Sequence, residues 1–108
     1  MAFLSILAES WLQLFRLFGL FRMKHWFVYM VRCADGSLYT GIATDVDRRV
    51  DEHNSTGNLA AKYTRARQPV KLVYSENVES RSEASKREYH IKKMTKLAKE
   101  KLIVAAEF

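Results

Sequence analysis

The run WFVYMVRCADGSLYTGI, residues 26–42, sets the architecture of the chain. Its first eight residues are aromatic or apolar except for Arg32, which is typical of a strand that is covered on both faces. Asp35 and Gly36 then stand at the centre of a short turn, and an Asp-Gly pair between two apolar runs is a strong hairpin signal. Residues 38–42 return as a second strand, so the run predicts a hairpin whose first strand is buried.

The chain directly after this hairpin predicts one helix and a polar loop. Thr44 is placed to cap a helix over residues 45–54, and Asp47 lies three positions later, where the helix dipole favours a negative charge. Residues 54–59, NSTGNL, are typical of a loop. The basic stretch KYTRAR at residues 62–67 is expected to be irregular chain.

A third strand and two more helices complete the expected elements. Residues 70–78, VKLVYSENV, predict the strand. Ser80 and Glu83 form a capping-box pattern, which indicates the start of a helix that ends at about residue 94. A further short helix is expected over residues 96–104. The order of strands and helices predicts an α+β domain.

Composition and charge exclude several classes of protein. The 108 residues suit one compact domain, and 48% hydrophobic with 28% charged residues is unlike a collagen-like or disordered chain. The single cysteine, Cys33, excludes an internal disulfide framework and a multi-cysteine zinc site. A reducing compartment is consistent with that, and we expect a cytoplasmic protein. The net charge of +6 favours a polyanionic or membrane partner.

Residues 1–22 differ from the rest of the chain, and we expect an apolar N-terminal extension there, followed by one domain over residues 23–108. The extension carries four of the six Phe residues, and its few polar residues trace one narrow helical stripe. Glu9 and Gln13 interrupt it, so a membrane span or signal peptide fits poorly. Three alternatives stay open: an over-extended gene start before Met23, a helix for a partner protein or for self-association, and a membrane anchor. Membrane contact is the least favoured of these.

One face of the first expected helix combines apolar and charged residues. Val46, Arg49, Val50 and His53 follow the i, i+3, i+4, i+7 spacing of a single face. The two valines direct that face to the core, so Arg49 and His53 should lie beside the core, where charge is costly without a partner. Taken singly, Arg49 is typical of a surface residue, and His53 is typical of a side chain that interacts with the helix dipole at a C-terminus.

The later helix carries one carboxylate on an apolar stripe. Ala84, Glu88 and Ile91 share a face at steps of four and three. The structural alternative for Glu88 is an ion pair with Lys92, four positions later.

Tyr29 and Tyr39 lie ten positions apart across the turn, so neighbouring strands can bring them together. Alone, each is typical of a buried core tyrosine with a satisfied hydroxyl. With Arg49, His53 and Glu88 they offer two phenols, a guanidinium, an imidazole and one acid. That set suits phosphate chemistry: the arginine stabilises anionic charge, the carboxylate holds a hard divalent ion, and a phenol or imidazole moves a proton.

The spacing of these residues resembles that of the GIY-YIG nuclease superfamily. Residues 28–30, VYM, stand where its first tripeptide belongs, and residues 39–41, YTG, where its second belongs. Arg49 follows eight residues after the second tripeptide, His53 four residues later, and Glu88 in the following helix. These three positions match the arginine, histidine and metal-binding glutamate of the superfamily.

The resemblance covers about residues 25–103 and is nearest to its small stand-alone bacterial members, the YhbQ-like group. The stretches AKYTRARQPVKLVY at residues 61–74 and SEASKREYHIKKM at residues 82–94 are characteristic of that group. The chain departs from the superfamily pattern in two places. Only Tyr29 of the first tripeptide is kept, and Thr40 stands in place of isoleucine.

The resemblance implies a small three-stranded antiparallel sheet flanked by helices and a phosphodiester hydrolase acting on DNA, with repair or recombination as its biological setting. A single Mg²⁺ or Mn²⁺ is expected on Glu88. Tyr29 would accept the proton of the attacking water, with His53 assisting. Arg49 would contact the phosphoryl oxygens, and Tyr39 would position water or the phosphate.

A second group of residues is expected to bind the nucleic-acid backbone. Such contacts give affinity with little sequence reading, and an aromatic ring among them can stack on a base. A non-cleaving nucleic-acid-binding or accessory module of the same fold is the alternative function. The expected nucleic-acid-binding residues are Lys62, Tyr63, Arg65, Arg67, Lys86, Lys92 and Lys93.

Overall fold

The computed structural model describes residues 25–107. The apolar extension expected at residues 1–22, and with it the expected domain boundary at Met23, lies outside the described residues. The elements of the described part are β1 (Trp26–Arg32), β2 (Leu38–Ala43), α2 (Val46–His53), α3 (Lys62–Arg65), β3 (Lys71–Val78), α4 (Arg81–Lys92) and α5 (Lys96–Ala106).

The three strands form one antiparallel sheet in the order β2-β1-β3, as the sequence resemblance predicts. β1 is central and its four middle residues are buried, which confirms a strand that is covered on both faces. The turn to β2 closes with a hydrogen bond from the Cys33 amide to the Ser37 carbonyl at 2.8 Å. Gly36 takes a φ of +83° in that turn, a conformation that other residues rarely adopt. The register places Tyr29 opposite Gly41 and Val31 opposite Tyr39.

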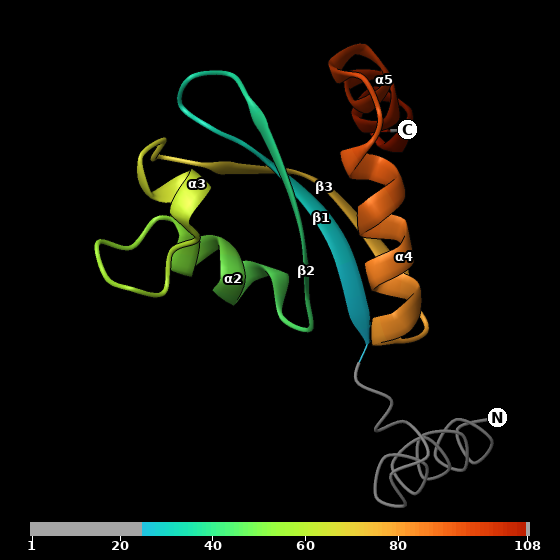
Figure 1. The fold of residues 1–108 in the computed structure, drawn as a ribbon, viewed down its shortest axis with the longest axis horizontal. Coiled ribbons are helices and arrows are strands. Elements are labelled where there is room, and N and C mark those ends of the chain that lie inside the picture. The colour runs from blue at the N-terminus through green and yellow to red at the C-terminus, as the bar shows by residue number, and fades with distance from the viewer. Residues whose placement is uncertain (1–24, 108) are drawn as a thin grey trace, which may run out of the picture.

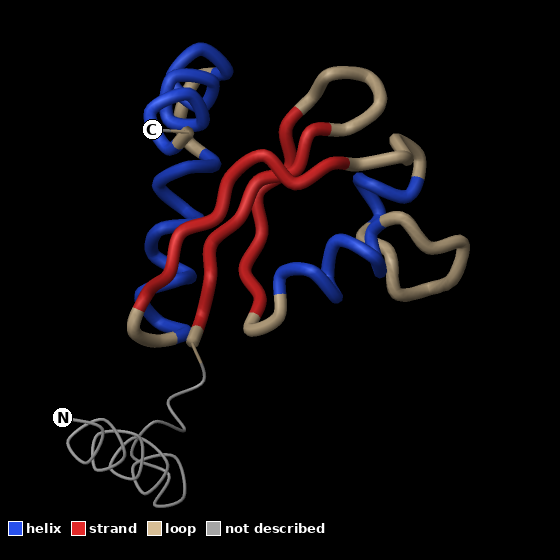
Figure 2. Tube along the Cα trace, turned by 180° about the vertical axis from the view of Figure 1, so that it is seen from behind, coloured by secondary structure: helices blue, strands red, loops and turns tan. Residues whose placement is uncertain are grey.

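Helices cover both faces of the sheet. α2 and α3 lie on one side, and α4 and α5 on the other (Figure 1). The view from behind shows the same two sides with the twisted sheet between them (Figure 2). None of the helices within residues 25–107 is long and apolar enough to cross a bilayer.

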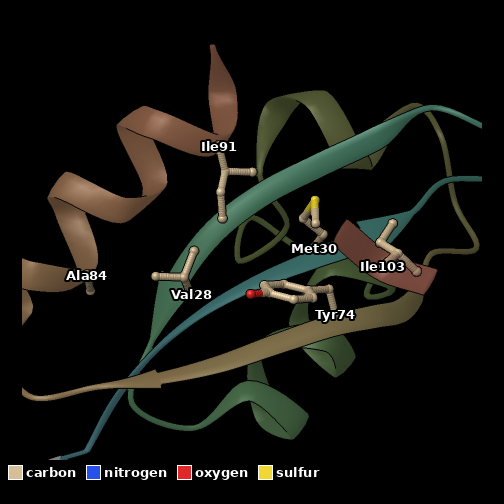
Figure 3. Close-up of a cluster of buried hydrophobic side chains, with 6 residues drawn as sticks. All are labelled: Val28, Met30, Tyr74, Ala84, Ile91 and Ile103. Atoms are coloured by element: carbon tan, nitrogen blue, oxygen red, sulfur yellow. The ribbon is translucent and has the colours of Figure 1, made fainter. Parts of the chain in front are cut away.

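Alternate residues of β1 belong to two separate hydrophobic clusters, because successive side chains of a strand point to opposite faces of the sheet. Val28 and Met30 pack with Ala84 and Ile91 of α4 on one side; Figure 3 shows this cluster, which Tyr74 and Ile103 complete. On the other side Tyr29 and Val31 form a cluster with Cys33 and Val70, against which Val46 and Val50 of α2 pack. The expected core-directed face of α2 is therefore confirmed.

Two details near α2 and α3 differ from the sequence prediction. The N-cap of α2 is Asp45 and not Thr44: Asp45 has extended backbone angles, and its carboxylate accepts from the Arg48 amide at 3.1 Å. The stretch at residues 62–67 is not irregular throughout, because residues 62–65 form the short helix α3. Thr64 fixes this turn by donating its hydroxyl proton to the Ala61 carbonyl at 3.1 Å. By contrast, Ser80 caps α4 as predicted, accepting from the Glu83 amide at 3.1 Å.

Candidate active site

The centre of the candidate site is a buried contact between a phenol and an imidazole. The Tyr29 hydroxyl lies 2.6 Å from Nε2 of His53. Tyr29 comes from the central strand and His53 from the last residue of α2. His53 is 0% exposed, so the core-directed helix face carries it inward as the sequence predicts.

The second ring nitrogen of His53 also has a hydrogen-bond partner. This nitrogen, Nδ1, lies 2.8 Å from Oγ1 of Thr64. Burial, and after it the nearby positive charge of Arg49, lower the pKa of His53 to about 4, while the negative charge of Glu52 opposes them. At neutral pH His53 is therefore an uncharged imidazole.

Tyr39 completes an aromatic column beside His53. Its ring meets the His53 ring edge-on at 5.1 Å between centroids and stacks on Tyr63 at 6.0 Å. Arg67 covers the Tyr63 ring, with its guanidinium carbon 3.9 Å from the centroid. The strand register thus brings the two predicted tyrosines to the same histidine.

Arg49 is anchored at the rim of this cluster. Its Nη1 donates to Oε1 of Glu52 at 3.0 Å and to the Leu59 carbonyl at 2.7 Å. It also lies beside the Tyr29 hydroxyl, where it acts to lower the pKa of that phenol. The guanidinium is consequently held by one carboxylate and one loop carbonyl, close to the phenol–imidazole pair.

The phenol of Tyr29 resists ionisation. Burial, and after it the neighbouring Tyr39, raise its pKa to about 12. Arg49 opposes this effect, whereas the negative charge of Glu88 contributes to it. Two groups in contact, one with a raised and one with a lowered pKa, are typical of a functional site.

Glu88 stands apart from the other four predicted residues. It lies on α4, which packs against β1 and β2 from the opposite side of the sheet. Its side chain is 24% exposed and pairs with Lys92 at 3.5 Å, as its structural alternative predicts. Because its charge influences the Tyr29 phenol, Glu88 is within electrostatic reach of the cluster. Tyr29, Tyr39 and His53 are therefore in direct contact. Arg49 is held at their rim, and Glu88 lies on a helix on the other side of the sheet.

Glu88 suits a metal site in which water and the substrate supply most of the ligands. Within residues 25–107, no three His, Cys, Asp or Glu side chains are arranged to hold a metal ion. Mg²⁺ commonly binds through one or two carboxylates together with waters and substrate phosphates. A partly exposed carboxylate such as Glu88 suits such a shared site and does not suit an all-protein cage.

The expected nucleic-acid-binding residues fall into two groups on opposite sides of the sheet. Lys62, Tyr63, Arg65 and Arg67 lie on or just after α3, beside Tyr39. Lys86, Lys92 and Lys93 lie on or at the end of α4, the helix of Glu88.

Several of these side chains already have partners. Arg67 pairs with Asp35 at 3.1 Å, and Lys86 with Glu83 at 3.6 Å. Lys93 lies 4.3 Å from the ring centroid of Tyr89.

Sequence reasoning missed two contributors to the site, Glu52 and Thr64, and the reason for a third. Gly41 belongs to the second tripeptide, and it lies under the Tyr29 ring, so that an added Cβ would stand 2.6 Å from the phenol oxygen. Glu52 and Thr64 hold Arg49 and His53. The spacing of Glu52 from Arg49 was a usable signal, since i, i+3 places them on one helix face. The Thr64 contact depends on tertiary packing.

Comparison with known proteins shows the family of the chain. Residues 25–101 match the GIY-YIG catalytic domain family. A GIY-YIG domain implies a nuclease-type function, with nucleic acid as the substrate and divalent metal ions as the usual cofactor.

Relatives from three bacteria are also similar to the chain. The UPF0213 protein DP2720 of Desulfotalea psychrophila is 57% identical over 82 residues, which cover 76% of this chain and 74% of that protein. A UPF0213 protein of Staphylococcus aureus is 56% identical over 81 residues, 75% of this chain and 96% of that protein. The solution NMR structure of EF2693 from E. faecalis has a TM-score of 0.53 and 40% identity, covering 77% of this chain and 86% of that one. The chain therefore belongs to the GIY-YIG family, in its YhbQ-like UPF0213 group.

Proposed function

We propose that this chain is a metal-dependent endonuclease domain that hydrolyses phosphodiester bonds in DNA, with structure-specific or weak sequence preference and a role in repair or recombination. The observation that carries the proposal is the buried Tyr29–His53 hydrogen bond with the Arg49 guanidinium beside it. This places a proton-transfer pair next to a fixed cation, which is what attack on a phosphate needs.

In this proposal Tyr29 and His53 act together as the base. A phenol with a pKa of about 12 is not a phenolate at neutral pH. It can nevertheless accept a proton from water while its own proton passes to Nε2 of His53, which is neutral. The proton of the attacking water then ends on the imidazole, and Tyr29 is neutral before and after the transfer.

Arg49 binds the phosphate and also changes the strength of the base. The guanidinium is the second cause, after burial, of the low pKa of His53. A phosphodiester that binds Arg49 brings a negative charge, which offsets this cause and raises the pKa of His53. Substrate binding would therefore strengthen the acceptor of the proton. Glu52 pairs with Arg49 in the free protein and so limits the movement of the guanidinium.

Glu88 would hold the divalent ion, Mg²⁺ or Mn²⁺. When bound, such an ion supplies Lewis-acid stabilisation of charge on the phosphoryl oxygens. The ion pair between Glu88 and Lys92 at 3.5 Å has to loosen to free the carboxylate. Because Lys92 is exposed on the surface of α4, the pair is screened and costs little to open.

The basic groups on α3 and α4 would bind the DNA backbone. Lys62 and Arg65 are exposed on α3, and Lys86, Lys92 and Lys93 on α4. Such contacts add affinity that falls steeply with salt. Tyr63 is already in contact with Tyr39 and Arg67, so we propose that it holds Tyr39 in place and that Lys62 and Arg65 supply the backbone contacts of α3.

One observation favours a second candidate function, a non-cleaving nucleic-acid-binding or accessory module. Glu88 is a single carboxylate already paired with Lys92, and the described part of the chain groups no further acidic ligands with it. This module would bind DNA in a salt-sensitive way and cleave none of it.

Cleavage of a panel of DNAs tests the proposal. Supercoiled, single-stranded and branched DNA are incubated with Mg²⁺ or Mn²⁺ and the wild-type chain or Arg49→Ala. Arg48→Ala is the matched control, because Arg48 is the neighbouring arginine on α2 and its side chain is 70% exposed. We expect cleavage by the wild type and by Arg48→Ala, and a loss of about 100-fold or more in Arg49→Ala. DNA binding without cleavage in all three proteins would support the second candidate function, and equal cleavage by all three would indicate a contaminant.

A further inference from the structure

A series of hydrogen bonds runs through the candidate site from Tyr29 to the Ala61 carbonyl at the start of α3. The Tyr29 hydroxyl lies 2.6 Å from Nε2 of His53. Nδ1 of His53 meets Oγ1 of Thr64 at 2.8 Å, and Thr64 meets the Ala61 carbonyl at 3.1 Å. His53 and Thr64 are both 0% exposed.

The contact with the Ala61 carbonyl determines where the hydroxyl proton of Thr64 lies. A carbonyl oxygen only accepts, so the hydrogen between Thr64 and Ala61 is the hydroxyl proton of Thr64. Having donated its one proton there, Oγ1 can act toward His53 only as an acceptor. Nδ1 of His53 must then carry the hydrogen in this contact.

The contact between His53 and Tyr29 is consistent with this assignment. His53 is uncharged at neutral pH, so a hydrogen on Nδ1 leaves Nε2 without one. Nε2 is then the acceptor, and the Tyr29 hydroxyl donates its proton to it at 2.6 Å.

We infer that Thr64 is a positioning residue, whose hydroxyl holds the proton of His53 on Nδ1 and so leaves Nε2 free to receive the proton of Tyr29. The transfer forms the Nε2–H bond, breaks the O–H bond of Tyr29 and leaves an imidazolium with a proton on each nitrogen. Thr64 then still accepts from Nδ1, so no group has to turn during the step. The catalytic importance of this tautomer rests on the proposed function, whereas the tautomer itself does not.

The role requires a hydroxyl at this place. Valine has nearly the shape of threonine but offers nothing to accept from Nδ1–H, which would leave a buried donor unpaired. Moving the proton to Nε2 avoids that unpaired donor, because Tyr29 can accept there. In that tautomer Nε2 no longer accepts a proton from Tyr29. Serine keeps the hydroxyl and should keep the tautomer.

The test is ¹⁵N NMR of the full chain, since the ring nitrogens of His53 report directly which one carries the proton. Spectra are compared at neutral pH for the wild type, Thr64→Val and Thr64→Ser. Thr56→Val is the matched control, because Thr56 is exposed in the loop after α2. We expect the proton on Nδ1 in the wild type, Thr64→Ser and Thr56→Val, and a shift of the population toward Nε2–H in Thr64→Val. If Thr64→Val does not fold, Thr64→Ala takes its place.

Single-turnover cleavage by the same variants gives the second readout. We expect at least about a tenfold loss in Thr64→Val, because a wrong tautomer removes the acceptor, and recovery in Thr64→Ser. A wild-type spectrum with the proton on Nε2, or an unchanged tautomer in Thr64→Val, would overturn the inference. So would a changed tautomer with unchanged cleavage. If no variant cleaves at all while the tautomers behave as expected, the proposed function fails and the assignment of Thr64 to the His53 tautomer stands.

Discussion

Gly41 faces Tyr29 directly across the β1–β2 ladder, and the phenol ring lies over it. A Cβ atom on residue 41 would stand 2.6 Å from the Tyr29 oxygen and 2.8 Å from the ring carbon that bears it, closer than non-bonded atoms approach. Residue 41 has no positive φ, so conformational freedom is not what requires a glycine. Because Gly41 has no side chain, the space above it is open to the Tyr29 ring, and the phenol can reach His53.

Gly41→Ala should damage both stability and activity. The added methyl group pushes the Tyr29 ring away from His53, and such overpacking costs about 1–3 kcal/mol in the free energy of unfolding. Cleavage should fall by about 100-fold or more, because the proton acceptor is displaced. Urea unfolding and single-turnover cleavage measure the two effects. Gly57→Ala is the control, since a Cβ there meets nothing within 4 Å; equal behaviour of the two variants would contradict the account.

Tyr29→Phe should separate folding from chemistry. The ring still fills its place, but Nε2 of His53 loses its partner, so stability should fall by about 1–2 kcal/mol. Cleavage should fall by about 100- to 10,000-fold, the range for loss of general-base catalysis. Tyr89→Phe removes an exposed hydroxyl from α4 and should change neither quantity. Activity near the wild-type level in Tyr29→Phe would exclude the phenol from the proton path.

Thr40→Val should stabilise the protein. Among residues 25–107 the Thr40 hydroxyl is the one buried side-chain polar atom without a hydrogen-bond partner. A valine of the same shape removes that desolvated group and should raise the free energy of unfolding by about 1 kcal/mol. Thermal and urea unfolding provide the measurement. A loss of stability would mean that the hydroxyl has a partner in solution.

Acid should destabilise the fold through His53. Its pKa is lowered from 6.5 to about 4 on folding, so the unfolded chain binds the proton more tightly than the folded one. This pKa difference contributes about 3 kcal/mol to the free energy of unfolding. The contribution is fully present above pH 6.5 and is lost as the pH falls toward 4.

Comparison with His53→Gln isolates this effect, because the other titrating groups are common to both proteins. The difference in the free energy of unfolding between the wild type and His53→Gln should become smaller as the pH falls from 6.5 to 4. A constant difference would show that His53 titrates alike in the folded and unfolded chains.

The elements of the fold were predictable because their signals are local. The apolar run of β1, the Asp-Gly turn and the Ser80 cap each depend on a few neighbouring residues. The α2 cap was wrong by one position because Thr44 and Asp45 are both good capping residues, and only the backbone angles decide between them.

The site was predictable only in part. The i, i+3, i+4, i+7 pattern places Arg49 and His53 correctly, and the resemblance to a family supplies Tyr29, Tyr39 and Glu88. The resemblance also marks Gly41 as part of a tripeptide, but the reason for a glycine there is the position of the Tyr29 ring, which only the structure shows. Thr64 contacts His53 from 11 positions away through the packing of α3, and this relationship has no local pattern in the sequence.

In the proposed mechanism the Tyr29–His53 pair and Glu88 of α4 serve one catalytic centre. The most direct test is the single-turnover rate of DNA cleavage with Mg²⁺ by the wild type and Glu88→Gln, with DNA binding measured alongside. Glu83→Gln is the control, being an exposed glutamate on the same helix. We expect cleavage by the wild type and Glu83→Gln, and a loss of at least about 100-fold in Glu88→Gln with binding retained. Equal rates for the wild type and Glu88→Gln, or no cleavage by the wild type, would show that Glu88 and the Tyr29–His53 pair do not form such a centre.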